Sequence, residues 1–317
     1  MVLKIITTSL HNIPQDTIIS PCAIALGNFD GIHKGHQKVI QPIFDYPHLT
    51  PSLVTFIPHP EEFFTGTRKQ LLTPIPEKCQ ILEKLGIQQL ILLPFDRNLA
   101  HLSPETFVIN ILIQKIKAQF ISVGEDFKFG YQRQGNAESL QHLANKHNIK
   151  VTITPEQNLI INNQSIRISS SYIRESLFLG KPELAMQMLD REYQIFGQVI
   201  EGQKLGRKIG FPTANLRFYP EKLLPKFGVY LVQIVLENHH LWGVMNLGNK
   251  PTVDGKNISI EVHLFDFNDN LYNKKITIKL IKFLRNEQKF NSLDELKKQI
   301  QIDCEKAKFI IYNLSKK

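Results

Sequence analysis

An apolar run, a glycine-rich turn and a helical pattern follow one another near the start of this chain, and this order constrains its fold most. Cys22–Leu26 (C-A-I-A-L) is typical of a buried strand, and Gly27–His36 continues as G-N-F-D-G-I-H-K-G-H before a helix expected to start at Gln37–Ile40. Glycines let the backbone approach an anion, and a helix N-terminus offers unpaired N–H groups. His33 and His36 are expected to point the same way. The segment predicts a nucleotide site, although an isolated H-x-x-H pair is also typical of surface histidines.

The length and charge of the chain limit its class. At 317 residues, two domains are expected. Lys and Arg number 38 against 29 Asp and Glu, a formal net charge of +9. This balance favours anionic partners, but it does not separate nucleotides from nucleic acid or an acidic membrane surface. The densest basic stretch, Lys274–Lys289, also fits a solvated surface.

The cysteines and the N-terminal sequence narrow the class further. Cys22, Cys79 and Cys304 lie far apart without a C-x-x-C motif, so neither a disulfide framework nor a zinc site is expected. The N-terminus lacks a long apolar core, and no segment approaches membrane-spanning length. We expect a cytoplasmic protein without a membrane-spanning segment. A weak homo-oligomer is left open.

The first half of the chain alternates apolar runs with amphipathic helical patterns, which predicts βαβ units and a mostly parallel sheet. One helix is expected at Pro76–Leu85, ended by Gly86, and another from an N-cap at Ser103 to about Lys117. Ligands of such sheets bind beyond the carboxyl ends of the strands. The expected strands are Cys22–Leu26, Leu53–Phe56, Gln89–Leu93, Phe120–Val123 and Lys150–Thr154.

The pattern changes near Gln194, where short strands with close turns predict an antiparallel barrel. A final helix is expected over Leu293–Asn313, with a capping box formed by Ser292 and Glu295. The predicted domains are residues 1–188 and 189–317, with the boundary after a helical pair at Tyr172–Leu179 and Pro182–Leu189. The expected barrel strands are Tyr193–Ile200, Gly228–Leu236, Leu241–Met245, Ile258–Phe265 and Lys275–Phe283.

Three further segments of the first half carry polar groups just after expected strands or at a helix start. They are Thr55–Pro60 (T-F-I-P-H-P), Gly124–Gly130 (G-E-D-F-K-F-G) and Arg167–Arg174 (R-I-S-S-S-Y-I-R). Each segment by itself also fits a turn, an aromatic core contact or a capped helix start. Their combination decides between these interpretations.

Together these segments resemble the nucleotidyltransferases with H-x-G-H and I-S-S-T-x-I-R signatures, in particular the N-terminal module of the bifunctional bacterial riboflavin kinase/FMN adenylyltransferase family, often called FAD synthetase. The matches are Gly27–His36, Thr55–Pro60, Val123–Gly130 and Ile168–Arg174. Ser171 stands where the family usually has threonine and keeps the hydroxyl. Pro42 and Pro47 shorten the helix after the turn. The resemblance implies a Rossmann-like α/β nucleotidyltransferase domain.

The resemblance also implies a reaction, the attack of an FMN phosphate oxygen on the α-phosphorus of ATP, with release of pyrophosphate. His33 and His36 would donate to the phosphates, and Asp126 would contact the ribose or the flavin phosphate. Such a reaction needs aligned reactants and neutralised charge more than covalent help. Residues implied to bind the nucleotide or flavin are Gly27, Phe29, Asp30, Gly31, His59, Asp126, Arg167, Ser169, Ser170, Ser171 and Arg174.

The second half opens with a basic glycine loop, Gly202–Asn215, that lacks the G-K-[ST] of a P-loop. Gly206 and Gly210 give freedom to a loop that could close over phosphates. In an extended segment Thr213 and Asn215 face the same side, so both could bind one hard cation. A turn with local side-chain to backbone hydrogen bonds is the alternative.

This half resembles the riboflavin kinase domain of the same family. The matching segments are G-R-K-I-G-F-P-T-A-N-L at Gly206–Leu216, K-F-G-V-Y at Lys226–Tyr230, Gly243–Val253, Glu261–Phe267 and L-R-N-E-Q-K-F at Leu284–Phe290. Lys250 stands in place of the usual arginine and Asn273 in place of a glycine. The resemblance implies that Thr213 and Asn215 hold Mg²⁺ and ATP phosphates and that Glu261 accepts the proton of the riboflavin 5′-hydroxyl. Further implied contacts are Gly206, Lys208, Gly210, Asn246 and Arg285.

The resemblance covers nearly the whole chain and implies two-step synthesis of FAD: phosphorylation of riboflavin to FMN, then adenylyl transfer from ATP to FMN. One alternative is an adenylyltransferase whose barrel only binds flavin, but Glu261 and the P-T-A-N segment are intact. The other is a non-enzymatic flavin- or RNA-binding regulator, which would favour clustered basic and aromatic residues on one face. The sequence does not show such a cluster, so we expect ATP, riboflavin and FMN as small-molecule substrates and no nucleic-acid or membrane partner.

Overall fold

The computed structural model describes residues 2–7, 17–202, 206, 209–252 and 255–316. The chain divides into two compact units, Met1–Ser170 and Ser171–Lys317, which are described separately. α8 packs against β11 and β16 of the second unit. The predicted domain boundary between residues 188 and 189 was drawn from the sequence pattern, and it stays a prediction.

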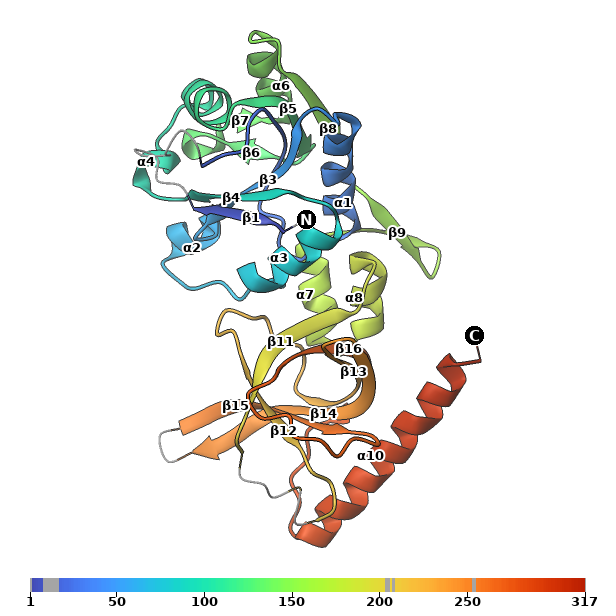
Figure 1. Ribbon diagram of the computed structural model, residues 1–317. Coiled ribbons are helices and arrows are strands. Elements are labelled where there is room, and N and C mark those ends of the chain that lie inside the picture. Colours follow the sequence, from blue (N-terminus) through green and yellow to red (C-terminus); the bar gives the residue numbers. More distant parts are fainter. Residues whose placement is uncertain (1, 8–16, 203–205, 207–208, 253–254, 317) are drawn as a thin grey trace. The chain divides into compact units, whose positions relative to one another are not determined.

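The first unit is built on a six-stranded sheet with the order β1-β4-β3-β2-β5-β8 (Figure 1). Every neighbouring pair is parallel, which confirms the expected α/β class. β2 and β8 have the predicted bounds, whereas β1 is a four-residue edge strand that the sequence pattern did not indicate. The strands are β1 (Lys4–Thr7), β2 (Cys22–Leu26), β3 (Thr50–Ile57), β4 (Gln89–Pro94), β5 (Ala118–Gly124) and β8 (Lys150–Thr154).

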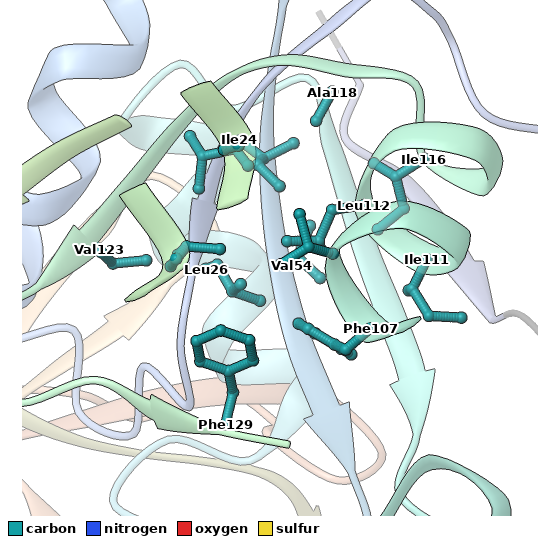
Figure 2. Packing of buried hydrophobic residues seen from close by; sticks show 14 of the residues in the cluster. Ile24, Leu26, Val54, Phe107, Ile111, Leu112, Ile116, Ala118, Val123 and Phe129 are labelled. Carbon is teal, nitrogen blue, oxygen red and sulfur yellow. The ribbon is translucent and has the colours of Figure 1, made fainter. Parts of the chain in front are cut away.

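Apolar side chains cover both faces of this sheet. In β2, Ile24 and Leu26 point to one face of the sheet and pack with Phe107 and Leu112. Ala23 points to the opposite face, which packs against the helices that follow β2 and β3. Figure 2 shows the first cluster, in which side chains of the sheet meet those of the helix after Ser103. Because both faces are buried, the sheet exposes its strand ends, and ligands are expected there.

The helices of the first unit mostly follow the sequence expectations. The helix predicted from Ser103 is a short α-helix that continues as a π-helix, in which Ile116 N donates to Ile111 O. Its N-cap is Ser103, as predicted. The helical segments are α1 (Lys34–Ile40), η1 (Gln41–Asp45), α2 (Pro60–Thr65), α3 (Ile75–Lys84), α4 (Arg97–Ala100), α5 (Pro104–Thr106), η2 (Phe107–Lys115), η3 (Tyr131–Arg133) and α6 (Ala137–Asn145). Two small hairpins are β6 (Lys128–Phe129) with β7 (Gly135–Asn136), and β9 (Asn158–Ile161) with β10 (Gln164–Arg167).

The helix after the glycine turn begins earlier than predicted. α1 starts at Lys34 rather than at Gln37, because the side chain of His33 caps it. The helix ends at Ile40 and passes into the tighter turn η1, which contains Pro42. Proline lacks the N–H that a continuing helix needs, so this short helix agrees with the sequence expectation.

The second unit is a closed antiparallel barrel with the order β11-β12-β15-β14-β13-β16 (Figure 1). β11 and β13 have the predicted bounds. β12 was missed, because Pro212–Asn215 was interpreted as part of a loop. The elements are α7 (Ser170–Phe178), α8 (Pro182–Leu189), β11 (Tyr193–Ile200), β12 (Ala214–Phe218), β13 (Gly228–Leu236), β14 (His239–Thr252), β15 (Gly255–Leu264), β16 (Lys275–Asn286) and α10 (Leu293–Leu314).

The last helix, α10, packs on the outside of the barrel (Figure 1). Cys304 and Ala307 join a cluster with Val229 of β13 and Val244 of β14. Ser292 caps the helix as predicted, but the capping box is incomplete, because the Glu295 carboxylate accepts from the Asn291 N–H instead of the Ser292 N–H. Within the described part of the chain, none of the helices combines the length and apolarity that a bilayer crossing requires.

Candidate active sites

The turn after β2 has an unusual backbone. Phe29, Gly31 and Ile32 have φ values of 50°, 94° and 44°, in the left-handed region. Glycine adopts this region freely, but a β-branched residue such as Ile32 does so only under strain. Strain of this kind persists only where the surroundings fix the chain, and it is concentrated at functional sites. The turn therefore needs strong external contacts.

Thr73 and Ser170 supply part of this support. The Thr73 N–H donates to Asp30 Oδ1 over 3.1 Å, and the Gly31 N–H donates to Thr73 Oγ1 over 2.9 Å. Ser170 Oγ donates to the Asp30 carbonyl over 2.7 Å. Asp30 is 4% exposed, so these contacts are made away from water. The structure thus brings the predicted Asp30, Gly31 and Ser170 together.

The carbonyl of Asn28 receives two further donors. Thr55 Oγ1 lies 3.0 Å and Lys78 Nζ 2.9 Å from this oxygen. Lys78 is 5% exposed, and its burial lowers the pKa of the ammonium to about 8, while the nearby Asp30 opposes the shift. Sequence reasoning missed Thr73 and Lys78, because nothing in a helical pattern distinguishes a buried lysine from a solvated one.

The two histidines of the turn form a stacked pair. Their ring centroids are 3.6 Å apart with an interplanar angle of 16°, so both rings do point the same way. The His36 N–H donates to His33 Nδ1 over 3.2 Å, which leaves Nε2 as the proton-bearing nitrogen of a neutral His33. A Cβ at Gly35 would lie 3.1 Å from His33 Cε1. Gly35, another residue missed from the sequence, therefore makes room for the ring.

Phe29 and Gly27 complete this turn. The Phe29 ring meets the His36 ring edge-on at 5.3 Å. The Gly27 N–H continues the sheet by donating to Val54 O, and a Cβ at Gly27 would lie 3.3 Å from the Phe29 ring. Both predicted residues thus shape the turn around the histidine pair.

His59 follows β3 at the same edge of the sheet, as predicted. Its Nδ1 accepts from the Glu61 N–H over 3.2 Å and caps α2. Burial lowers the pKa of His59 to about 4, with Lys69 adding to the effect. The imidazole is neutral at pH 7, and Nε2 carries its proton. His59 can therefore donate one hydrogen bond to a ligand but supplies no positive charge.

Phenylalanines gather at this edge, a feature that sequence reasoning missed. Phe95, which follows β4, lies 5.4 to 5.7 Å from three other rings in edge-on contacts. One of these rings, Phe64, is 69% exposed. The run T-F-I-P-H-P-E-E-F-F carried the signal, but only the tertiary structure adds the ring that follows β4. The four residues are Phe56, Phe63, Phe64 and Phe95.

Arg167 and Asp126, both predicted to bind ligand, contact each other instead. Arg167 Nη2 lies 2.6 Å from Asp126 Oδ2 and 2.5 Å from Glu156 Oε1. These side chains are largely exposed, so the pairs contribute little to stability. A ligand role for Arg167 would require it to exchange these carboxylates for a phosphate, and this role stays a prediction. Ser169, Ser171 and Arg174 lie at or just beyond the division between the units, and their roles also stay predictions.

In the second unit, Asn215, Glu261 and Asn246 form a row across three neighbouring strands. Asn215 of β12 and Asn246 of β14 are both register partners of Glu261 in β15. Thr213 Oγ1 donates to Glu261 Oε2 over 3.4 Å. Directly opposed residues share a face of the sheet, so the hydroxyl, the two amides and the carboxylate lie on one side. On β13, Val229 is the register partner of Asn246 and packs against α10. The row therefore lies on the face of the barrel that α10 partly covers.

Two described glycines before β12, Gly202 and Gly206, lie close to residues of this row or beside it. A Cβ at Gly202 would overlap the Asn215 amide, and one at Gly206 would overlap the Phe211 carbonyl and approach Thr213 Oγ1 at 3.3 Å. Gly210 has a φ of 85°, which favours glycine. The local structure thus requires glycine at positions 206 and 210. Sequence reasoning did not single out Gly202. Lys208 lies outside the described residues.

Arg285 forms an ion pair with the buried side chain of Asp303. Its Nε lies 2.9 Å from both oxygens of Asp303 in α10, and its Nη2 lies 2.8 Å from Oδ2. Asp303 is 4% exposed and also accepts from Gln299. This arrangement ties α10 to the barrel. The predicted ligand contact of Arg285 stays a prediction.

The row in the second unit suits a small, hard cation. Among the described residues, no three His, Cys, Asp or Glu side chains gather as a metal site. Mg²⁺ is usually held by one or two protein oxygens together with substrate phosphates and water. Thr213 Oγ1, Asn215 Oδ1 and the Glu261 carboxylate offer oxygens of that kind on one face.

Comparisons with known proteins agree with both halves. The FAD synthetase family model matches residues 15–172, and the riboflavin kinase model matches residues 189–311. A bifunctional riboflavin kinase/FMN adenylyltransferase of Haemophilus influenzae is 39% identical over 304 residues, covering 94% of this chain and 96% of that protein. The Escherichia coli (strain K12) protein of the same name is 36% identical, covering 93% and 94%.

A solved structure supports the fold along the chain. A crystal structure described as a macrolide-efflux protein from Streptococcus pneumoniae has a TM-score of 0.83 and 28% identity, covering 95% of this chain and 98% of that one. That description belongs to the streptococcal protein. With two family models in the expected order and relatives matched over nearly their whole length, this chain belongs to the bifunctional riboflavin kinase/FMN adenylyltransferase family.

Proposed function

We propose that this protein makes FAD in two steps, each in its own unit. The second unit phosphorylates riboflavin with ATP to give FMN, and the first transfers AMP from ATP to FMN. The observation that carries the proposal is the presence, in one chain, of the stacked His33–His36 pair at a helix start and of the hydrogen bond from Thr213, just before β12, to Glu261 of the neighbouring strand β15. The family membership supports the same order of activities.

In the adenylyl transfer, an oxygen of the FMN phosphate bonds to the α-phosphorus of ATP, and the bond from that phosphorus to the bridging oxygen breaks. Pyrophosphate leaves with the electron pair. His33 donates from Nε2 to the phosphates, because its Nδ1 is occupied by the His36 N–H. His36, held against His33 and Phe29, offers a second donor. Preorganised donors of this kind stabilise the charge of the transition state.

The phenylalanine cluster supplies a place for the flavin ring. Phe64 exposes most of its ring at the sheet edge that carries His59, and Phe95 holds it edge-on. Aromatic rings favour stacked or edge-on partners, which suits a flat, apolar isoalloxazine. We therefore assign this edge to FMN.

In the kinase step, the riboflavin 5′-oxygen bonds to the γ-phosphorus of ATP, and ADP leaves. Glu261 accepts the hydroxyl proton, and Thr213 steadies the carboxylate. Mg²⁺, when bound, neutralises phosphate charge. Thr213 and Asn215 are the residues that would hold it. A cytoplasmic location, the absence of nucleic-acid and membrane partners, and a weak homo-oligomer stay predictions.

One assay of the purified protein tests this function. Riboflavin, ATP and Mg²⁺ are supplied, and FMN and FAD are separated over time. We expect FMN to appear first and FAD to follow. Formation of FAD only from added FMN would instead favour an adenylyltransferase with a flavin-binding barrel. Tight flavin binding without either product would favour a non-enzymatic regulator.

A further inference from the structure

The strained turn after β2 requires a support that the predicted site residues do not explain. Three hydrogen bonds reach Asn28, Asp30 and Gly31 from two residues at the start of α3. These are Thr73, just before the helix, and Lys78 within it. The start of α3 thus supports the turn through hydrogen bonds.

Lys78 is an unusual residue for such a structural support. Its side chain is almost fully buried, although a lysine on a helix can normally extend into water. Burial of an ammonium is costly, and an apolar residue of similar size would pack there without that cost. A buried ammonium at this position therefore needs partners that offset the cost of its burial. The partners are the Asn28 carbonyl, at 2.9 Å, and the field of the buried Asp30.

The contacts of Lys78 lead directly to the histidine pair. Asn28 and Asp30 flank Phe29, so fixing both residues also fixes the left-handed Phe29 between them. The Phe29 ring in turn lies edge-on against His36. Without the ammonium, the Asn28 carbonyl keeps the Thr55 donor but loses that of Lys78, so Phe29 and the His36 ring against it would be held less firmly.

We propose that Lys78 is a positioning residue for adenylyl transfer: its ammonium, close to the buried Asp30, holds the Asn28 carbonyl, and through it the turn that orients Phe29 and His36. This inference rests on the proposed function of the first unit. We assign Lys78 no contact with the reacting atoms. Its effect is on the alignment of the phosphate donors.

The test compares Lys78→Met and Lys78→Arg with Lys84→Met, a charge removal at an exposed lysine in the same helix. Adenylylation of FMN and phosphorylation of riboflavin are measured separately. We expect Lys78→Met to lower kcat for adenylylation by about 100-fold, as a misaligned site does, with KM for ATP changed far less. Kinase activity should be unchanged. Lys78→Arg should recover part of the kcat, and Lys84→Met should equal the unaltered protein.

The pH profile of the unaltered protein gives a second measurement that does not depend on how the variants fold. The buried ammonium has a pKa of about 8, so adenylylation, but not phosphorylation, should decline above about pH 8. The charged and titratable groups that act on Lys78 are Asp30 and Cys79, and His59 feels its field. Burial raises the pKa of Cys79 above its ordinary value, and a Cys79→Ser variant should keep the same decline.

The outcomes separate this inference from the proposed function. If the unaltered protein makes no FAD from FMN and ATP, the proposed function fails and this inference fails with it. If the unaltered protein makes FAD and Lys78→Met has the same kcat, only the role of Lys78 is refuted. If Lys78→Met does not fold, a flat adenylylation profile between about pH 7 and about pH 9.5 refutes the role of the ammonium, and a decline supports it.

Discussion

The hydroxyl of Ser170 donates a hydrogen bond of 2.7 Å to the main-chain carbonyl of Asp30, 140 residues earlier in the sequence. Ser170 is the last residue of the first unit, and this bond ties it to the turn that carries the histidine pair. Ser170, from one signature segment, is therefore hydrogen-bonded to the other signature segment, Gly27–His36, within the first unit. The bond gives Ser170 a structural reason that is independent of any ligand.

Replacing Ser170 tests this connection. Ser170→Ala removes the donor to a partly buried carbonyl and should cost about 1 kcal/mol in the free energy of unfolding of the first unit. Adenylylation should fall, while phosphorylation of riboflavin should not. Ser170→Thr keeps a hydroxyl and serves as the matched control. Chemical denaturation and the two separate assays provide the measurements, and equal behaviour of the alanine and threonine variants would contradict the role of this bond.

Gly35→Ala should separate stability from activity. A methyl group at this position would lie 3.1 Å from His33 Cε1 and displace the ring. Alanine is at the same time a better helix former than glycine, by about 1 kcal/mol. We therefore expect a melting temperature that is equal or higher and an adenylylation rate that is at least about 10-fold lower. Unchanged adenylylation would show that the ring has room to spare.

His59 predicts a particular dependence of stability on pH. Its pKa is lowered to about 4 in the folded protein by burial, against an ordinary value of 6.5. Between these values the unfolded chain binds a proton that the folded chain does not, so the free energy of unfolding falls as the pH drops from 6.5 towards 4. Proton NMR should show His59 neutral down to about pH 4, and His59→Asn should reduce the acid sensitivity. Titration of His59 near pH 6.5 would contradict this account.

The ion pair between Arg285 and Asp303 should be a large contributor to the stability of the second unit. Asp303→Asn leaves a partly buried guanidinium without its carboxylate, and breaking such a pair costs about 3 kcal/mol or more. A matched control is Asp294→Asn, at the exposed start of the same helix. Urea unfolding of both variants measures the difference. Equal midpoints would show that α10 is held by its apolar face alone.

Apolar patterning predicted much of the fold from the sequence. The predicted and observed bounds agree for β2, β8, β11 and β13. Their runs of apolar or alternating apolar side chains match the pattern of burial along each strand. β12 was missed because Pro212–Asn215 has the composition of a turn, and only its pairing with β15 makes it a strand. Strand pairing depends on distant residues, which local patterns do not encode.

The site was predictable where several special residues stand together in sequence, as in Gly27–His36. It was not predictable where one ordinary residue contributes from elsewhere. Lys78 and Asp303 both lie in helices, where a charged residue is normally taken to face water, yet both are buried. Arg167 is a different case: its guanidinium pairs with two carboxylates in the structure, and its predicted contact with a phosphate stays a prediction.

The central claim is that one chain holds two independent sites, and a pair of variants tests it most directly. His36→Ala should lower FMN adenylylation by about 100-fold or more, since removal of a preorganised donor costs about 3 kcal/mol in the transition state, and should leave riboflavin phosphorylation intact. Glu261→Gln should abolish phosphorylation while added FMN is still converted to FAD. Loss of both activities in either variant, or of neither, would contradict the account.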